Sequence, residues 1–162
     1  MIVGNRKDFM DIVGKLGAHR RVLVLGCNEC VTVCGVGGER EVAVLASEIR
    51  IYWKKEGETF EVREHTLERQ CDYEYVDQIR GFAADYDVIV SMACGAGVQY
   101  VAEAYKTKRV IPAVNTTFLG VTLEQGVWSE RCQGCGSCIL DMTAGVCPIA
   151  RCAKSLLNGP CG

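Results

Sequence analysis

The sequence predicts an α/β protein: a small Rossmann-like, doubly wound parallel sheet, followed by an irregular cysteine-rich metal-binding lobe. Two observations lead to this fold class. Short apolar runs that suit buried strands alternate with stretches whose apolar residues recur at helical spacing, as in a parallel sheet covered by helices. This alternation stops after Phe118, and six of the eleven cysteines follow it. We therefore expect two domains, residues 1–118 and residues 119–162.

The first part of the α/β domain is predicted to be a helix, a strand and a second helix. Residues 5–16 carry apolar side chains at helical spacing with charged residues between them, and Gly17 would end this helix. Residues 21–26 form a short apolar run, which is typical of a strand buried on both faces. After a loop of cysteines and glycines, residues 39–55 again place their apolar side chains on one helical face.

The second part continues the alternation and then loses it. We expect strands at 59–65, 86–92 and 109–114, and helices at 72–83 and 98–106. Pro112 indicates that the last strand lies at an edge of the sheet, because proline cannot donate a ladder hydrogen bond. Residues 119–162 contain seven glycines and no clear strand. They have too few apolar residues for a core of their own, so a metal or cluster would have to hold this lobe together.

Composition restricts the class of protein. The chain has 162 residues, of which 49% are apolar, enough for one domain with an ordinary core. The net charge of −2 and the lack of a basic stripe argue against binding of nucleic acid. The chain begins with charged residues, and no stretch approaches the roughly 18 apolar residues of a membrane span. We therefore expect a cytoplasmic protein without membrane insertion.

Eleven cysteines are a high number for a chain of this length. Disulfides are disfavoured by the odd count and by the expected reducing compartment, so metal binding is the better interpretation. The two histidines, His19 and His65, lie far from the cysteine motifs in the sequence. Sites made of thiolate alone are typical of iron–sulfur clusters or of cysteine-only zinc.

The first cysteine motif is Cys27-x2-Cys30-x3-Cys34. Three thiolates in one loop can bind three corners of a cubane cluster, and the fourth ligand then comes from elsewhere, here from Cys94 or Cys71. The carboxyl ends of parallel strands meet at one edge of a sheet, which is where ligands bind in such folds. Because Cys27, Cys71 and Cys94 each follow a predicted strand, we expect them to meet there.

Glycines after this motif allow two interpretations. Gly35, Gly37 and Gly38 would let backbone amides approach the sulfur atoms and stabilise a negatively charged cluster. The alternative is a phosphate-binding loop of a nucleotide site. Its spacing does not fit Gly-x-Gly-x-x-Gly, so we favour the metal site.

The second motif lies in the C-terminal lobe, where two successive two-residue gaps resemble the ferredoxin cluster run. Its cysteines are Cys132, Cys135, Cys138 and Cys147, the last followed by Pro148, with Cys152 and Cys161 beyond them. The last gap has eight residues instead of three, and two-residue gaps serve zinc equally well, so iron and zinc both remain open. Two four-thiolate clusters would leave three cysteines spare. Cys71 is our first candidate to be spare in the first group, and Cys138 or Cys152 in the second.

The residues of the tail resemble the cysteine-rich signature of the MetV family. These proteins are small subunits of the methylenetetrahydrofolate reductase of acetogens and related anaerobes. The resemblance extends from about residue 20 to the end of the chain, and it is carried by Cys27-Asn-Glu-Cys30, Ser91-Met-Ala-Cys94-Gly-Ala-Gly97, Cys132 to Cys138, Thr143-Ala-Gly-Val-Cys147-Pro148 and Cys152-Ala-Lys154-Ser-Leu-Leu-Asn158-Gly-Pro-Cys161-Gly.

The resemblance implies a subunit without catalytic residues of its own. Its partner would be a flavin-containing barrel subunit of the MetF type, which reduces methylene-tetrahydrofolate in the folate branch of the Wood–Ljungdahl pathway. We expect iron–sulfur clusters, two of the [4Fe–4S] type, with zinc as the alternative in the C-terminal lobe. Electrons from ferredoxin or another iron–sulfur subunit would enter at Cys27, Cys30, Cys34 and Cys94 and leave toward the flavin. The alternatives are a zinc-braced assembly subunit and a redox- or metal-sensing switch.

Overall fold

The computed structural model describes residues 1–152, which fall into two compact units. One unit comprises Gly4–Thr116, and the other comprises Met1–Val3 together with the chain from Thr117 onward. Both boundaries lie inside strands, β1 (Ile2–Arg6) and β6 (Val114–Glu124). Cys161, one of the predicted ligands, lies outside the described residues.

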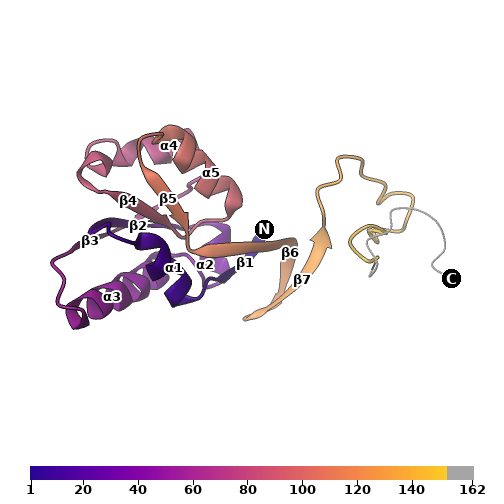
Figure 1. Ribbon diagram of the computed structural model, residues 1–162. Helices are drawn as coiled ribbons and strands as arrows, with labels where there is room; N and C mark the ends of the chain where they lie inside the picture. Colours follow the sequence, from indigo (N-terminus) through magenta and orange to yellow (C-terminus); the bar gives the residue numbers. More distant parts are fainter. Residues whose placement is uncertain (153–162) are drawn as a thin grey trace. The chain divides into compact units, whose positions relative to one another are not determined.

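The Gly4–Thr116 unit is built on a four-stranded parallel sheet (Figure 1). Its strands are β2 (Arg21–Cys27), β3 (Glu61–Leu67), β4 (Val88–Ser91) and β5 (Arg109–Pro112), in the order β3-β2-β4-β5. All three pairings are parallel. Later strands lie on both sides of β2, which is the doubly wound arrangement, so the predicted fold class is confirmed. The strand that contains Pro112 is an edge strand, as expected.

Helices cover both faces of this sheet (Figure 1). The helices are α1 (Phe9–Leu16), α2 (Cys30–Val33), α3 (Glu39–Lys55), α4 (Tyr73–Val76) and α5 (Gly95–Ala104), with 3₁₀ turns η1 (Asp77–Ile79) and η2 (Ala83–Asp85). The apolar side chains of α1 and α3 pack on one face, and those of α4, η1, η2 and α5 on the other. Within residues 1–152, no helix combines the length and the apolar character needed to cross a bilayer.

The central strand β2 shows why its sequence is an uninterrupted apolar run. Val22 and Val24 belong to the apolar cluster on the α1–α3 face, and Leu23 and Leu25 belong to the cluster on the opposite face. All four side chains are fully buried. Successive side chains of a strand point to opposite faces, so a strand covered on both sides needs apolar residues at every position.

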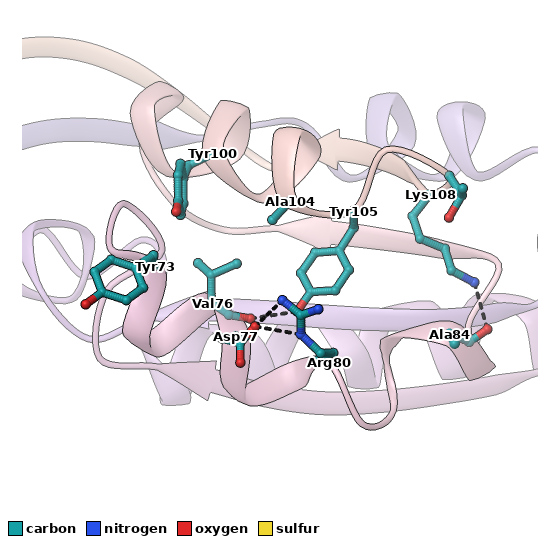
Figure 2. A pocket seen from close by; sticks show the side chains of 10 residues that line it. Tyr73, Val76, Asp77, Arg80, Ala84, Tyr100, Ala104, Tyr105 and Lys108 are labelled. Carbon is teal, nitrogen blue, oxygen red and sulfur yellow. Dashed lines mark hydrogen bonds and ion pairs between the residues drawn. The ribbon is translucent and has the colours of Figure 1, made fainter.

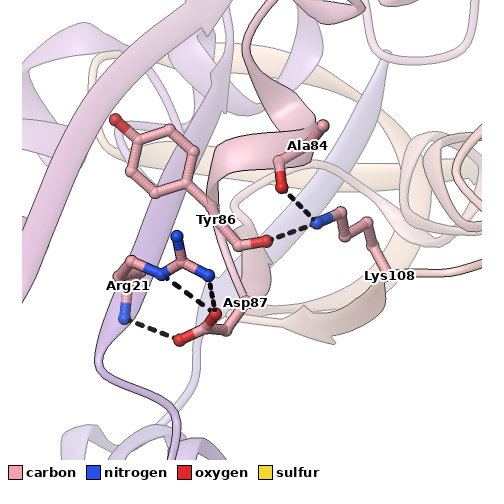
Figure 3. Close-up of polar contacts among 5 residues, drawn as sticks. All are labelled: Arg21, Ala84, Tyr86, Asp87 and Lys108. Atoms are coloured by element: carbon pink, nitrogen blue, oxygen red, sulfur yellow. Dashed lines mark hydrogen bonds and ion pairs between the residues drawn. The ribbon is translucent and has the colours of Figure 1, made fainter.

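The amino edge of the sheet is closed by side chains (Figure 3). The Asp87 carboxylate accepts hydrogen bonds from the backbone N–H of Arg21 at 3.1 Å and from its guanidinium at 2.7 Å. These bonds also hold the pKa of Asp87 below its ordinary value. Lys108 donates to the carbonyl oxygens of Ala84 and Tyr86, each at 2.7 Å. The starts of β2, β4 and β5 are therefore tied together at the edge opposite the cysteines.

The N-terminal prediction was wrong in its first residues. Residues 5–16 do not form one helix, because Ile2–Arg6 is strand β1 and α1 begins only at Phe9. Asp8 sets this start, since its side chain accepts the N–H of Met10 at 2.8 Å as an N-cap. The predicted stop at Gly17 is confirmed, and this residue has a φ of 55°.

The predicted helix at 72–83 was also wrong as a continuous element. The chain there forms α4, η1 and η2, with N–H bonds to carbonyl groups three residues back at Arg80 and Phe82. Gly81 lies between these turns, and glycine disfavours a continuous helix. Helix α2 was not predicted, because a loop was expected between residues 26 and 39, and the remaining strands and helices of this unit occur where predicted, with ends displaced by a few residues.

The second unit contains strands that the sequence interpretation missed. β6 pairs with β7 (Val127–Cys132) as an antiparallel hairpin, and the sheet order is β1-β6-β7. The turn uses Gly126, whose φ of 86° suits a tight connection. Residues 133–152 contain neither helix nor strand, as predicted for the lobe. The hairpin ends at Cys132 and so fixes the chain where the first tail cysteine begins this irregular segment.

Candidate functional site

The carboxyl edge of the parallel sheet brings together cysteines from three loops. Cys27 is the last residue of β2, Cys71 follows β3, and Cys94 lies between β4 and α5 as the N-cap of that helix. The thiol of Cys27 is close enough to the other two that negative charge on Cys71 and Cys94 raises its pKa, after the larger effect of burial. The sheet topology therefore gathers these three residues, as the sequence predicted.

The sulfur of Cys27 lies in a buried pocket of backbone groups. Burial raises the pKa of the Cys27 thiol, and hydrogen bonds from the backbone N–H groups of Glu29 and Gln70 lower it. Its Sγ–H points to the carbonyl oxygen of Glu68 at 3.9 Å. Backbone N–H groups directed at sulfur favour the thiolate, which is the form that binds a metal. Burial is the larger effect, so Cys27 is a neutral thiol in the metal-free chain, and these N–H groups would stabilise its sulfur once a metal displaces the proton.

Cys30 begins the short helix α2, and Cys34 is its C-cap. Cys34 is buried, and burial raises the pKa of its thiol. A hydrogen bond from the backbone of Gly4 lowers this pKa, and the nearby thiol of Cys30 raises it. The thiols that affect the pKa of Cys27 are thus Cys71 and Cys94, and the thiol that affects the pKa of Cys34 is Cys30. Cys71, our first candidate to be spare, is therefore one of the two thiols that act on Cys27.

Gly37, one of the glycines after the first motif, has a packing role that was not predicted. The N–H groups that reach Cys27 come from Glu29 and Gln70. Gly37 instead allows two loops to approach, because a Cβ atom on it would lie only 1.9 Å from the carbonyl oxygen of Met92. Its own carbonyl oxygen accepts the N–H of Cys27 at 2.9 Å. Gly37 therefore holds the loop after β2 against the loop that leads to Cys94.

Two buried polar residues of this edge were missed in the sequence interpretation. Gln70 and Ser91 are both fully buried, and the Oγ–H of Ser91 donates to Oε1 of Gln70 at 2.6 Å. The Nε2 group of Gln70 donates to the carbonyl oxygens of Leu25 at 2.8 Å and Gly26 at 3.0 Å. The sole sequence signal for Gln70 is its position beside Cys71, since a single glutamine belongs to no motif.

The tail contains a second thiol cluster. Four cysteines line one cavity of about 310 Å³, together with Ile139, Leu140, Pro148 and Ile149; they are Cys132, Cys135, Cys138 and Cys147. These are the four cysteines of the ferredoxin-like run. Cys152 is half-buried and does not line this cavity. The four cysteines of this run therefore lie around one cavity within one unit.

Backbone groups approach the tail sulfur atoms as well. The N–H of Gly134 points to Sγ of Cys132 at 3.3 Å, and the N–H of Ala150 points to Sγ of Cys147 at 3.4 Å. Gly134 has a φ of 66°, a conformation that L side chains rarely adopt, so glycine is needed for this tight turn. The same N–H···S contact stabilises thiolates, as noted for Cys27.

The donor atoms decide which metals would fit. Both clusters offer sulfur alone, which suits iron–sulfur clusters and zinc better than hard cations such as magnesium. No disulfide joins two cysteines within residues 1–152. In that part of the chain, no three cysteine, histidine or acidic side chains already stand in the arrangement of a bound ion. Metal binding would therefore require the sulfur atoms to converge further.

A separate cavity of about 500 Å³ lies between α4 and α5 (Figure 2). Its lining includes Tyr73, Tyr100 and Tyr105 and contains no cysteine. The cations there already have partners. Arg80 donates to the carboxylate of Asp77 at 2.6 Å, and Lys108 is held by two carbonyl groups. The thiol clusters remain the sites with distinctive chemistry.

The cysteine-rich tail is also the part of the chain that matches a known family. Residues 111–162 match a family model described as "Methylene-tetrahydrofolate reductase C terminal". This part of the chain is similar to the C-terminal region of methylene-tetrahydrofolate reductases. The match covers roughly a third of the sequence and includes β6, β7 and all the tail cysteines. No curated protein and no solved structure matches the chain.

Proposed function

We propose that the protein is an iron–sulfur electron-transfer subunit of a methylene-tetrahydrofolate reductase, of the MetV type. The observation that carries this proposal is the coincidence of two features in one segment. The segment related to the reductase holds the four cysteines that line a common cavity. An iron–sulfur cluster bound there would supply one-electron transfer, the chemistry needed to exchange electrons with a flavin.

The tail ligands would be Cys132, Cys135, Cys138 and Cys147. Their common cavity and the N–H groups of Gly134 and Ala150 near two of the sulfur atoms support this set. Iron–sulfur clusters carry negative charge, and backbone N–H groups that point to sulfur stabilise it. Cys152 and Cys161 would not be needed for a four-thiolate site.

The edge ligands would be Cys27, Cys71 and Cys94, with Cys30 as the fourth. Electrostatic proximity of the first three supports this choice over the set with Cys34. Cys30 lies three residues after Cys27, the gap that allows two thiolates to bind one centre. Cys34 would then be a buried thiol at the end of α2 without a ligand role.

The proposal includes partners that act with this subunit. A flavin-containing reductase subunit of the MetF type would bind folate, and ferredoxin or another iron–sulfur subunit would exchange electrons with this chain. Thiolate ligands of this kind persist in reducing compartments, so the proposal also includes a cytoplasmic location. The pathway would be the folate branch of the Wood–Ljungdahl pathway.

The test is metal analysis with electron paramagnetic resonance on the full chain purified without oxygen. We expect iron and sulfide at cluster stoichiometry and a signal on reduction with dithionite. Cys71→Ser and Cys135→Ser should each remove one cluster's share of the iron. Cys34→Ser is the matched control for the edge site and should retain all the iron. Iron-free protein without a signal would refute the electron-transfer function.

A zinc-braced assembly subunit is the second candidate. The two-residue gaps and the N–H···S contacts of the tail fit tetrahedral zinc as well as iron. Under this alternative the tail contains stoichiometric zinc, and removal of any iron leaves the reductase rate of the complex unchanged. A loss of the rate together with the iron supports electron transfer instead.

A further inference from the structure

The buried glutamine at the thiol edge joins its own loop to strands β2 and β4. Within residues 1–152, Gln70 and Ser91 are the polar side chains that are fully buried. A buried amide costs free energy unless its donor and acceptor are both used. Here Nε2 donates to two carbonyl oxygens of β2, and Oε1 accepts from Ser91 at the end of β4. The amide is therefore satisfied by the two strands whose ends carry cysteines.

Each contact of Gln70 lies close to one cysteine. Gln70 itself precedes Cys71, and the carbonyl groups that it binds belong to Leu25 and Gly26, directly before Cys27. Its acceptor contact is with Ser91, three residues before Cys94. The loop that carries Cys71 is thus anchored to the two strands that deliver the other thiols.

The packing around Gln70 requires a glycine at position 97 of α5. A Cβ atom on Gly97 in α5 would lie 2.9 Å from Cβ of Gln70 and 2.8 Å from Cβ of Ala93. Real Cβ atoms do not approach so closely, so the first turn of α5 is in direct contact with Gln70. The helix that begins after Cys94 is therefore placed against the same side chain.

We propose that Gln70 is the positioning residue of the edge site, whose amide holds Cys71 beside Cys27 and Cys94. This inference rests on the proposed function in one respect, because it treats the three thiols as one site. The positioning itself is a property of the metal-free chain and can be measured without metal. A purely structural glutamine would stabilise the core without deciding which thiols are neighbours.

The same loop offers a matched control. Arg69 forms an ion pair with Glu29 at 3.3 Å, and both side chains are almost half exposed. Exposed ion pairs stabilise a structure weakly, because water and salt screen the charges. Arg69→Gln therefore changes the residue next to Gln70 without removing a buried anchor.

The experiment is cross-linking of the metal-free, reduced full chain with the bifunctional thiol reagent dibromobimane, followed by peptide mapping. Wild-type protein should yield a bridge between Cys71 and Cys27 or Cys94. In Gln70→Met, which keeps the volume and loses the amide, the bridge should fall about tenfold. Arg69→Gln should stay within about twofold of wild type. Ile49→Ala, in α3 on the other face, controls for loss of stability and should keep the bridge.

The outcomes separate this inference from the proposed function. An unchanged bridge in folded Gln70→Met overturns the inference, as does an equal loss in Ile49→Ala. If Gln70→Met does not fold, Ser91→Ala decides, because it removes a single bond to Gln70. A fall of about threefold is then expected, and an unchanged bridge overturns the inference. A chain that forms the bridge but binds no metal refutes the proposed function alone.

Discussion

At the scale of single residues, the thiol edge depends on positions that carry no ligand atom. Gly37 brings the backbone after β2 against the carbonyl group of Met92, and Gln70 anchors the loop before Cys71. The cysteines could be predicted because their spacing has a chemical meaning. Gln70 could not, because its importance comes from burial and from partners that are distant in sequence. Gly37 was noticed, but the reason for a glycine there emerged only from the packing.

Gly37→Ala should therefore destabilise the protein strongly. The new Cβ atom would lie only 1.9 Å from the carbonyl oxygen of Met92, so the two atoms would overlap. Backbone atoms cannot yield as a side chain does, so we expect a loss of at least about 2 kcal/mol in the free energy of unfolding. Urea denaturation of the metal-free chain measures this loss.

Gly14→Ala is the control for this substitution. Gly14 lies in α1, and an added Cβ atom would meet nothing within 4 Å. Alanine should stabilise this helix by about 0.5–1 kcal/mol, because it loses less backbone entropy on folding. Equal midpoints for Gly37→Ala and wild type would show that the two cysteine loops are not packed as described.

At the scale of helices and strands, prediction succeeded where the apolar pattern was regular. Strand β2 and helix α3 were recognised because their apolar residues fill both faces of a strand or one face of a helix. The hairpin of β6 and β7 was missed, since most of its residues are exposed and its alternation is weak. The helix expected at 72–83 broke into turns around Gly81. Sequence interpretation thus depends on a regular apolar pattern, which the hairpin lacks and which Gly81 interrupts at 72–83.

Strand β3 contains a group that should make stability depend on pH. The ring of His65 lies edge-on to Phe82, with 5.3 Å between their centroids. Burial lowers the pKa of His65 below 6.5, and the charge of Arg63 lowers it further. The folded state therefore prefers neutral His65. Its contribution to stability is complete above pH 6.5 and is lost as the pH falls through the lowered value.

The corresponding experiment compares wild type with His65→Gln at several pH values. The free energy of unfolding of wild type should fall between pH 7 and pH 5, and the fall should be smaller in the variant, which has no imidazole to protonate. Urea denaturation at each pH gives both curves. Parallel curves would show that the environment of His65 does not disfavour its charged form.

At the scale of the whole molecule, the two units differ in what can stabilise them. The Gly4–Thr116 unit has two apolar clusters, one on each face of its sheet. The tail has no such core among residues 133–152, and its apolar side chains include Met142 and Val146, which are 80% and 55% exposed. This contrast could be predicted from composition, because glycine and cysteine replace the apolar periodicity there. Burial alone therefore stabilises the first unit but not the tail.

Removal of metal should consequently loosen the tail and leave the first unit folded. If thiolates hold the tail together through a metal, a chelator removes the free energy of binding that orders it. Trypsin should then cut after Arg151, which is exposed in the irregular segment, at least about tenfold faster, since cleavage follows the population of open chain. The helical circular dichroism of the Gly4–Thr116 unit should change little. The double variant Cys135→Ser/Cys147→Ser should be cut rapidly even before chelation, because it lacks two of the four thiols that line the tail cavity. Equal cleavage rates with and without chelator would mean that no metal orders the tail, whatever the cysteines at the sheet edge bind.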